Sequence, residues 1–243
     1  MLYTARPRQS SAGEAIGIIL LDATAPIIPG DVANATTYNF PVRFQLVPGL
    51  TSERIFKHDL TLVDSVIEAG MALKSYGVRA ITGDCGFLAL YQTEMARRLE
   101  LPVFMSSLLQ VPFMLRLIPD FHKVGIITAN SQSLDEAVLT PCGANVPERI
   151  VIRGLEDCPN FAGTFIEENG ILDTEKVEAE VVSMATALVR DVPEVKMLLL
   201  ECSDLAPYGQ AIQQVTGLPV FDFVTMINYV FSAVVKQGFS GYM

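Results

Sequence analysis

The fold is decided by a stretch that occurs twice. Residues 78–105 read VRAITGDCGFLALYQTEMARRLELPVFM, and residues 195–222 read VKMLLLECSDLAPYGQAIQQVTGLPVFD. The two copies lie at a constant offset of 117 residues, and nine of their twenty-eight positions are identical. Cys85 matches Cys202, and Leu-Pro-Val-Phe recurs near the end of each copy. Composition does not force a cysteine to recur at the same place, so the repeat indicates a duplicated structural unit.

Each copy predicts the same order of elements. A buried strand (residues 80–82 and 197–200) is followed by a polar turn with the cysteine, an amphipathic helix, and Leu-Pro-Val-Phe as the next strand. The repeat extends to the start of each half, because KVGIIT at 123–128 resembles AIGIIL at 15–20. Ligands of open parallel α/β sheets bind at the carboxyl ends of the strands. Both cysteines therefore follow strands at the edge where such sites form.

This pattern predicts an α/β protein of two pseudo-symmetric lobes, each a parallel sheet flanked by helices, with the active site in the cleft between them. A chain of 243 residues that is duplicated at about half its length favours two lobes over one. We assign residues 1–115 and 224–243 to the first lobe and 116–223 to the second, because we expect the last helix to cross back. Hydrophobic periodicity and turn residues predict further strands at 15–21, 42–47, 123–128 and 149–153, and helices at 51–76, 106–118, 134–140, 174–190 and 224–236.

Composition restricts the class of protein. Half of the residues are hydrophobic, which is enough for two cores, and the net charge of −10 disfavours nucleic acid as a partner. Residues 1–14 contain no signal-peptide pattern, and the apolar runs are shorter than the roughly 20 residues that span a bilayer. We therefore expect a soluble cytoplasmic protein with reduced thiols and no membrane partner. Apolar helices rich in Phe and Met favour a homodimer.

The four cysteines contain no CxxC pair, and His58 and His122 are the only histidines, so the sequence predicts no metal site. Two cysteines that face each other across a cleft suit a different chemistry. One thiolate can remove a proton from a carbon acid while the other thiol delivers one to the opposite face. Asp204, two residues after Cys202, is our candidate for assisting the proton transfer; capping the next helix is the alternative role.

Several residues are candidates for binding the substrate. Asp22 ends the first strand and either orients the substrate or caps the next segment. The loop residues Thr128, Asn130 and Ser131 either hold a carboxylate at a helix N-terminus or serve as ordinary caps. Backbone N–H groups after each cysteine can stabilise a developing enolate. The residues that follow the cysteines complete the candidate set: Gly86, Phe87 and Ser203.

Taken together, the cysteine turns and the duplication resemble the aspartate/glutamate/hydantoin racemase superfamily over nearly the whole chain. The resemblance implies an isomerase that needs no pyridoxal phosphate, metal or other cofactor, with Cys85 and Cys202 as acid and base. It implies a small carboxylate or a hydantoin-like molecule as substrate. Cys202-Ser203-Asp204 is similar to the acidic variant of the second family motif found in aspartate racemases. Gly86-Phe87 replaces the Asn-Thr of glutamate racemases, which disfavours glutamate and indicates a less polar substrate.

Three alternatives stay open at this point. The first is a related decarboxylase or cis-trans isomerase of small carboxylic acids. The second is a two-lobed protein that binds a small ligand without catalysis. The third is a redox role, in which Cys85 and Cys202 form a reversible disulfide; this requires their Cα atoms to lie within about 7 Å.

Overall fold

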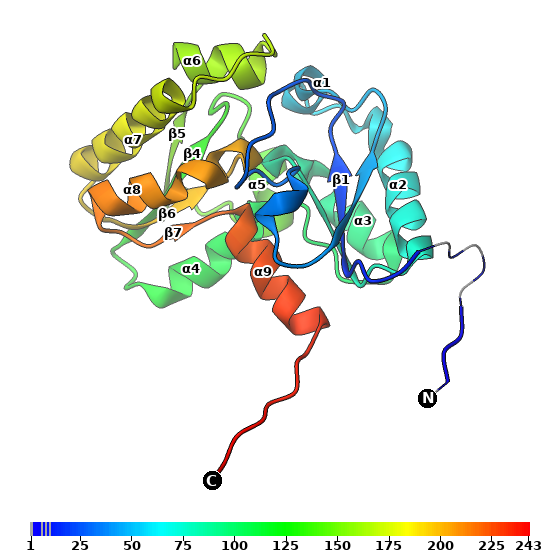
Figure 1. Ribbon diagram of the computed structural model, residues 1–243. Coiled ribbons are helices and arrows are strands. Elements are labelled where there is room, and N and C mark those ends of the chain that lie inside the picture. Colours follow the sequence, from blue (N-terminus) through cyan, green and yellow to red (C-terminus); the bar gives the residue numbers. More distant parts are fainter. Residues whose placement is uncertain (1, 6, 8, 10) are drawn as a thin grey trace.

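Two parallel sheets, each flanked by helices, form two lobes in the computed structural model, which describes residues 2–5, 7, 9 and 11–243 (Figure 1). The first sheet has the strand order β2-β1-β3 and the second has the order β5-β4-β6-β7. This arrangement confirms the predicted α/β fold. The strands are β1 (Ile16–Leu20), β2 (Val42–Leu46), β3 (Ala80–Gly83), β4 (Lys123–Thr128), β5 (Ile150–Gly154), β6 (Val195–Leu200) and β7 (Val220–Phe221).

The strand register repeats between the lobes. Gly17 of β1 pairs with Ile81 of β3, and Gly125 of β4 pairs with Leu198 of β6. Leu198 also pairs with Val220 of β7, whereas the equivalent pair in the first lobe is an isolated bridge from Ile81 to Val103. The duplication in the sequence is therefore a duplication in structure. The strand predicted at Leu-Pro-Val-Phe forms in the second copy, and in the first copy it is reduced to that bridge.

Nine α-helices are present in the part of the chain that the structure describes, together with short 3-10 and π segments. The α-helices are α1 (Ser52–Phe56), α2 (Val63–Tyr76), α3 (Gln92–Leu99), α4 (Val111–Leu117), α5 (Glu136–Leu139), α6 (Pro159–Phe161), α7 (Thr174–Asp191), α8 (Gly209–Thr216) and α9 (Phe223–Val234). Two 3-10 helices, η3 (Gly86–Tyr91) and η7 (Ser203–Tyr208), begin directly after the repeated cysteines.

The prediction of one continuous helix over residues 51–76 is wrong. Thr51 caps α1 as expected, but the helix ends at Phe56, and His58 takes a left-handed backbone conformation with φ of 55°. The Asp59 side chain then accepts a hydrogen bond from the Thr61 backbone N–H and starts a new segment. A carboxylate that bonds to a nearby backbone N–H favours a turn or cap over a continuous helix.

Helix α7 follows its predicted pattern. The Asp173 carboxylate accepts a hydrogen bond from the Lys176 N–H and caps the helix. Val177, Val181, Ala185 and Leu188 are fully buried, at the spacing of one helix face. Gly125 allows β4 to approach this face, because a Cβ there would lie 2.8 Å from Leu188 Cδ2.

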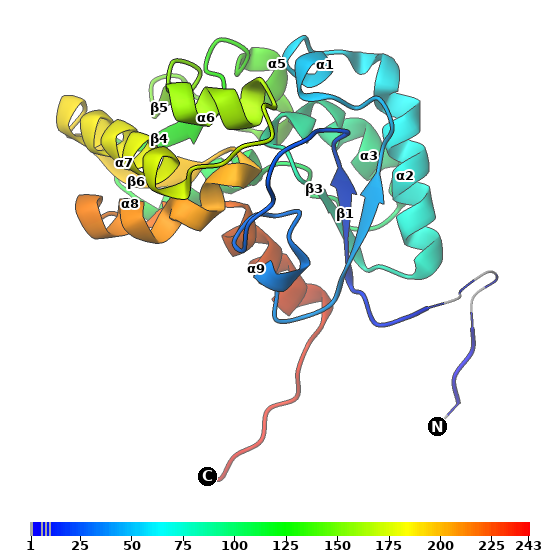
Figure 2. The same ribbon diagram turned by 45° about the horizontal axis from the view of Figure 1, so that its top comes forward.

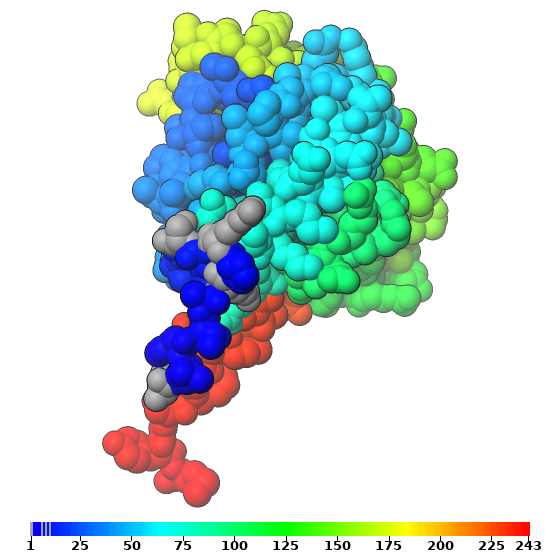
Figure 3. All heavy atoms as spheres, turned by 90° about the vertical axis from the view of Figure 1, so that its right-hand side faces the viewer, coloured from blue at the N-terminus to red at the C-terminus, as the bar shows by residue number. Residues whose placement is uncertain are grey.

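Helix α9 joins the two lobes. Its residues Phe223, Met226 and Ile227 are buried in one cluster with Ile16 and Ile18 of the first sheet. The chain thus leaves β7 of the second sheet and packs its last helix against the first. Residues 1, 6, 8 and 10 of the predicted first lobe lie outside the description. Figure 3 shows the C-terminal residues, in red, extending away from the body of the molecule. No helix within the described residues has the length and apolar character to cross a membrane.

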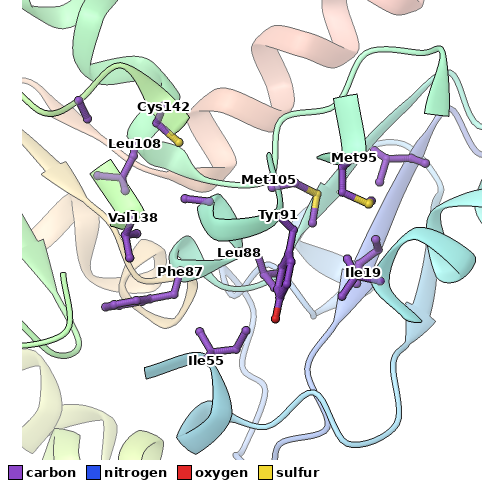
Figure 4. Packing of buried hydrophobic residues seen from close by; sticks show 14 of the residues in the cluster. Ile19, Ile55, Phe87, Leu88, Tyr91, Met95, Met105, Leu108, Val138 and Cys142 are labelled. Carbon is purple, nitrogen blue, oxygen red and sulfur yellow. The ribbon is translucent and has the colours of Figure 1, made fainter. Parts of the chain in front are cut away.

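The segment after Cys85 is anchored in a buried hydrophobic cluster that contains residues of both lobes (Figure 4). Phe87, Leu88 and Tyr91 of η3 are almost completely buried. The Tyr91 hydroxyl donates a hydrogen bond of 2.6 Å to the Asp59 carbonyl. The Phe87 ring contacts the Phe56 ring edge to face, with centroids 5.0 Å apart. This packing holds the turn that carries Cys85 in place.

Candidate active site

The two repeated cysteines line the same inner cavity, which has a volume of about 40 Å³. Each cysteine has an extended backbone and directly precedes a 3-10 helix. Both side chains are free thiols. The other residues of the cavity wall come from both lobes: Leu21, Ser52, Phe56, Asp84, Gly86, Phe87, Ala129, Phe165, Glu201, Ser203 and Asp204. The structure therefore brings Cys85, Cys202, Gly86, Phe87, Ser203 and Asp204 together, as the sequence predicts.

A larger outer cavity of about 270 Å³ adjoins the inner one. Leu21, Ser52, Asp84, Phe165, Ser203 and Asp204 line both cavities. The outer cavity adds Asp31, Glu168 and apolar residues of the loop after β1, which runs between the lobes in Figure 2. The Thr24 backbone N–H donates a hydrogen bond of 2.9 Å to Glu168 Oε2, so segments from the two lobes meet at this cavity.

The Cys202 thiol is hydrogen-bonded to a carboxyl pair. Its Sγ donates to Asp204 Oδ2 at 3.2 Å. The carboxyl groups of Asp204 and Asp31 also form a hydrogen bond with each other. Burial and the neighbouring Asp204 raise the pKa of Asp31 to about 9, so Asp31 carries a proton at neutral pH. Burial also raises the pKa of Asp204, and its hydrogen bonds from Asp31 and Cys202 oppose that shift.

Glu201, directly before Cys202, is completely buried beside the thiols. Thr128 Oγ1 donates a hydrogen bond of 2.8 Å to Glu201 Oε2, while Oε1 has no partner among the described residues. Burial raises the pKa of Glu201 to about 7, and the bond from Thr128 opposes this shift. Gly86 packs directly against the carboxyl group, because any Cβ at this position would overlap it. Only glycine fits there without a shift of the neighbouring side chain.

Asp84, directly before Cys85, is the equivalent acid of the first copy. Its carboxylate accepts hydrogen bonds of 3.0 and 3.2 Å from the Leu21 backbone N–H. The Ser203 hydroxyl donates to the Asp84 carbonyl and ties the two cysteine turns together. Burial raises the pKa of Asp84 to about 8, against the effect of the bond from Leu21.

Neither thiol shares the inner cavity wall with a cationic side chain of the described residues. Burial, followed by the charges of Glu201 and Asp84, raises the pKa of Cys85 well above its ordinary value, although the Phe87 N–H lowers it in part. Burial and the charge of Asp204 raise the pKa of Cys202 in the same way. Both side chains are therefore protonated thiols in the free protein. The position of each cysteine before a 3-10 helix does not make it a thiolate, because burial among carboxyl groups outweighs the effect of the helix N-terminus.

Four other predicted residues do not line the two cavities. Asp22 Oδ2 accepts a hydrogen bond of 2.8 Å from the Gly49 N–H. Asn130 Oδ1 accepts from the backbone N–H groups of residues 132 and 133, and the Ser131 side chain bonds to Glu156. The Thr128 hydroxyl donates its hydrogen bond to the Glu201 carboxylate. Their roles in binding a substrate stay predictions.

Four acids that line the two cavities, Asp31, Asp84, Glu168 and Glu201, were not among the predicted site residues. One signal could have pointed to Asp31: it lies in the long loop after β1, and long loops inside compact domains are usually functional. Within the described part of the chain, no group of three His, Cys, Asp or Glu residues is placed to hold a metal ion.

The raised pKa values predict that the protein loses stability as the pH rises. Asp31, Asp84 and Glu201 have pKa values of about 9, 8 and 7 in the folded chain, against ordinary values of 3.8, 3.8 and 4.5. Between about pH 4 and pH 9 the folded state therefore binds more protons than the unfolded state, which lowers the free energy of unfolding as the pH increases. We expect the thermal midpoint, measured by circular dichroism, to fall from about pH 5 to pH 9. Glu201→Gln should flatten the decline below about pH 7; a midpoint that rises with pH would contradict the assignment.

Comparison with known proteins shows which proteins this chain resembles. No protein-family model matches the chain. A dimethylsulfoniopropionate lyase from Durusdinium sp. clade D is 31% identical over 230 residues, which cover 88% of this chain and 73% of that protein. Dimethylsulfoniopropionate lyase 3 from Emiliania huxleyi (strain CCMP1516) is 33% identical over 223 residues. Those residues cover 88% of this chain, and the chain spans only 58% of the length of that relative.

Solved structures with the same fold are more distant in sequence. Allantoin racemase from Pseudomonas fluorescens superposes with a TM-score of 0.62 at 18% identity, over 91% of each chain. Unliganded arylmalonate decarboxylase gives a TM-score of 0.57 at 16% identity, over 93% of this chain and 94% of that one. Aspartate racemase from Picrophilus torridus gives 0.57 at 16% identity, over 91% and 94%. The predicted resemblance is thus confirmed in the fold.

The relatives found by sequence are named as lyases. The expected isomerase activity is therefore not supported by the sequence comparison. Their names favour the alternative of a related enzyme that acts on a small carboxylic acid, although they name neither a decarboxylase nor a cis-trans isomerase. On the fold of the Asp/Glu/hydantoin racemase superfamily, the chain belongs to the family of dimethylsulfoniopropionate lyases.

Proposed function

We propose that the protein is a lyase that eliminates dimethyl sulfide from dimethylsulfoniopropionate. This compound carries a carboxylate and a dimethylsulfonium group on either side of two methylene carbons. A base removes a proton from the carbon next to the carboxylate, and the freed electron pair forms a carbon–carbon double bond. The carbon–sulfur bond breaks at the same time or directly afterwards. The products are dimethyl sulfide, acrylate and one proton.

The acidic lining of the two cavities is the observation that supports this proposal. Every side chain with an acidic or basic group that lines the inner or outer cavity is a carboxylic acid: Asp31, Asp84, Glu168, Glu201 and Asp204. Among the described residues of these two walls there is no Lys, Arg or His. A bound cation favours the ionised form of these carboxyl groups and is then attracted by them, whereas a second carboxylate beside them is disfavoured. A substrate with a sulfonium group fits this acidic lining better than aspartate or glutamate does.

Aromatic rings support the same orientation. Phe56 and Phe165 line the inner cavity, and Phe165 also lines the outer one. The faces of aromatic rings attract cations and their methyl groups. We place the sulfonium group near Phe165 and the carboxyl pair of Asp31 and Asp204. The substrate carboxylate then faces the backbone N–H groups in the first turns after Cys85 and Cys202, which are donors suited to a developing enolate.

Cys202 is our candidate for the base. Its proton can move to Asp204 Oδ2 at 3.2 Å. In the free protein, burial and negative neighbours hold the pKa of Cys202 high. A bound sulfonium adds a positive charge beside the thiol, and a nearby opposite charge favours the thiolate. The substrate itself thereby promotes formation of the base that attacks it.

The size of the cavities agrees with a small substrate that enters from outside. The inner cavity has room for about one water molecule, and the outer one is several times larger. The two meet at the wall shared by Phe165 and Asp204. We infer that the substrate occupies the outer cavity and that its acidic carbon reaches the inner one at this wall.

Product analysis tests the proposal. The purified protein is mixed with dimethylsulfoniopropionate; dimethyl sulfide is measured in the headspace and acrylate by proton NMR. We expect the two products in equal amounts. A protein that forms neither product, but exchanges the Cα proton of chiral amino acids or hydantoins with D₂O, would be a racemase instead. Loss of carbon dioxide from aryl malonates would indicate the decarboxylase.

A further inference from the structure

The proposed elimination sets a requirement that racemisation does not. A racemase delivers a proton back to its substrate, whereas acrylate takes none, so each elimination leaves one proton on the base. Cys202 lines only the inner cavity, which has room for about one water molecule, and not the larger outer one. The inference below rests on the proposed function: the enzyme needs a way to move this proton out before the next turnover.

Three side chains are arranged in order from the inner cavity to the outer one. Cys202 lines only the inner cavity, Asp204 lines both, and Asp31 lines only the outer one. The thiol donates to Asp204 Oδ2 at 3.2 Å, and the Asp204 carboxyl group is hydrogen-bonded to that of Asp31. The set is therefore continuous from the candidate base to the larger cavity.

The fold holds Asp31 in this position from the other lobe. Asp31 Oδ1 accepts a hydrogen bond of 2.7 Å from the Ala33 N–H, and its carbonyl accepts one of 2.6 Å from Thr37 Oγ1. Gly30, with φ of 101°, approaches the η7 segment that carries Asp204, because a Cβ on it would lie 3.0 Å from the Cα of Pro207. A residue other than glycine would be strained there and would push the loop away.

We propose that Cys202, Asp204 and Asp31 form the exit route for the proton that each elimination releases. Asp31 gives its proton to water or buffer in the outer cavity and takes one from Asp204. Asp204 is then free to take the proton of the Cys202 thiol when the next substrate binds, which forms the thiolate again. One proton leaves the protein and no electrons are transferred. Asp31 is thus a positioning residue for proton transfer rather than a catalytic one, since it acts through Asp204.

Asp31→Asn tests the route, because the amide can still donate a hydrogen bond to Asp204 but cannot pass a proton on. We expect steady-state turnover to fall about 100-fold. The first turnover should stay close to the wild-type rate, so rapid-quench measurements should show a burst of about one acrylate per active site. Small buffer acids and bases at high concentration should restore part of the steady rate, and Asp31→Glu should restore most of it.

Asp222→Asn is the matched control. Asp222 is partly buried and caps α9, where its carboxylate accepts hydrogen bonds from Thr225. It lines neither cavity. This variant should show normal turnover, no burst and no dependence on buffer. Asp31→Asn turnover at the wild-type rate would overturn the route. Equal loss of the first turnover, without a burst, would also overturn it, since that pattern indicates a purely structural role.

A second measurement does not depend on the reaction. After transfer to D₂O, infrared spectroscopy follows the S–H band of the buried thiols, with Cys202→Ser used to identify the band of Cys202. We expect exchange at Cys202 to be at least tenfold slower in Asp31→Asn than in the wild type. Unchanged exchange would refute the route. If the wild type forms no dimethyl sulfide but exchange at Cys202 is still slower in Asp31→Asn, the proposed function is refuted and the route is not.

Discussion

Cys202→Ser is expected to lower the kcat of dimethyl sulfide release by about 1,000-fold, whereas Cys85→Ser should lower it only about tenfold. A serine hydroxyl is far less acidic than a thiol, so the substituted side chain cannot supply the base that removes the proton from carbon. Cys202 is also the thiol that is bonded to Asp204, which can take its proton. Acrylate accepts no proton, so elimination does not need an acid on the opposite face, where Cys85 would act.

Initial rates of dimethyl sulfide release at saturating substrate measure this contrast. Circular dichroism and thermal midpoints of both variants check that the fold is intact. A loss of about 1,000-fold in both variants would contradict the assignment of one base. Such a result would point to proton transfer on both faces by the two thiols, which is the chemistry that the duplicated cysteines suggested from the sequence. A large loss in Cys85→Ser alone would move the role of base to Cys85.

A neutral isostere is expected to bind about 100-fold more weakly than a cationic one. 3-(Dimethylammonio)propanoate and 4-methylpentanoate share shape and carboxylate, but only the first carries a positive charge where the substrate has its sulfonium. One charge about 4 Å from a carboxylate contributes up to about 4 kcal/mol near a protein surface, and screening reduces this value. A difference of 100-fold corresponds to about 2.7 kcal/mol.

Isothermal titration calorimetry gives the two dissociation constants and does not depend on turnover, which Asp204→Asn should impair. Asp204→Asn removes a carboxylate that lines both cavities and should narrow the ratio of these constants. Asp135→Asn is a suitable control, because Asp135 caps α5 and lines neither cavity. Equal affinity of the wild type for the two isosteres would show that the acidic wall does not recognise the sulfonium group.

The duplication made much of the fold predictable. Strand β4 has the predicted bounds, and the face of α7 that was expected to pack is buried. The position of both cysteines directly after a strand followed from the local pattern alone. These features depend on the periodicity of apolar residues and on turn residues, which act between neighbours in the sequence.

The rule that side chains alternate along an extended strand does not hold for the acids before the cysteines. Adjacent side chains of a strand point to opposite faces, so this rule would direct Asp84 and Glu201 away from the thiols. In the structure β3 ends at Gly83 and β6 at Leu200, so both acids lie beyond the strands. Each acid lines the inner cavity together with its cysteine. The change of backbone conformation at the strand ends was not visible in the apolar pattern.

The sequence by itself determined the two lobes, the parallel sheets and the two cysteine turns, because each arises from local hydrophobic patterns that recur at a constant offset. Only the tertiary structure decided which charges surround the thiols. Asp31 lies in a loop without periodicity, and it becomes buried only because that loop docks on η7 of the other lobe. Its raised pKa and its bond to Asp204 depend on desolvation and on a neighbour 173 positions away. Such effects act through space, so the order of residues along the chain does not reveal them.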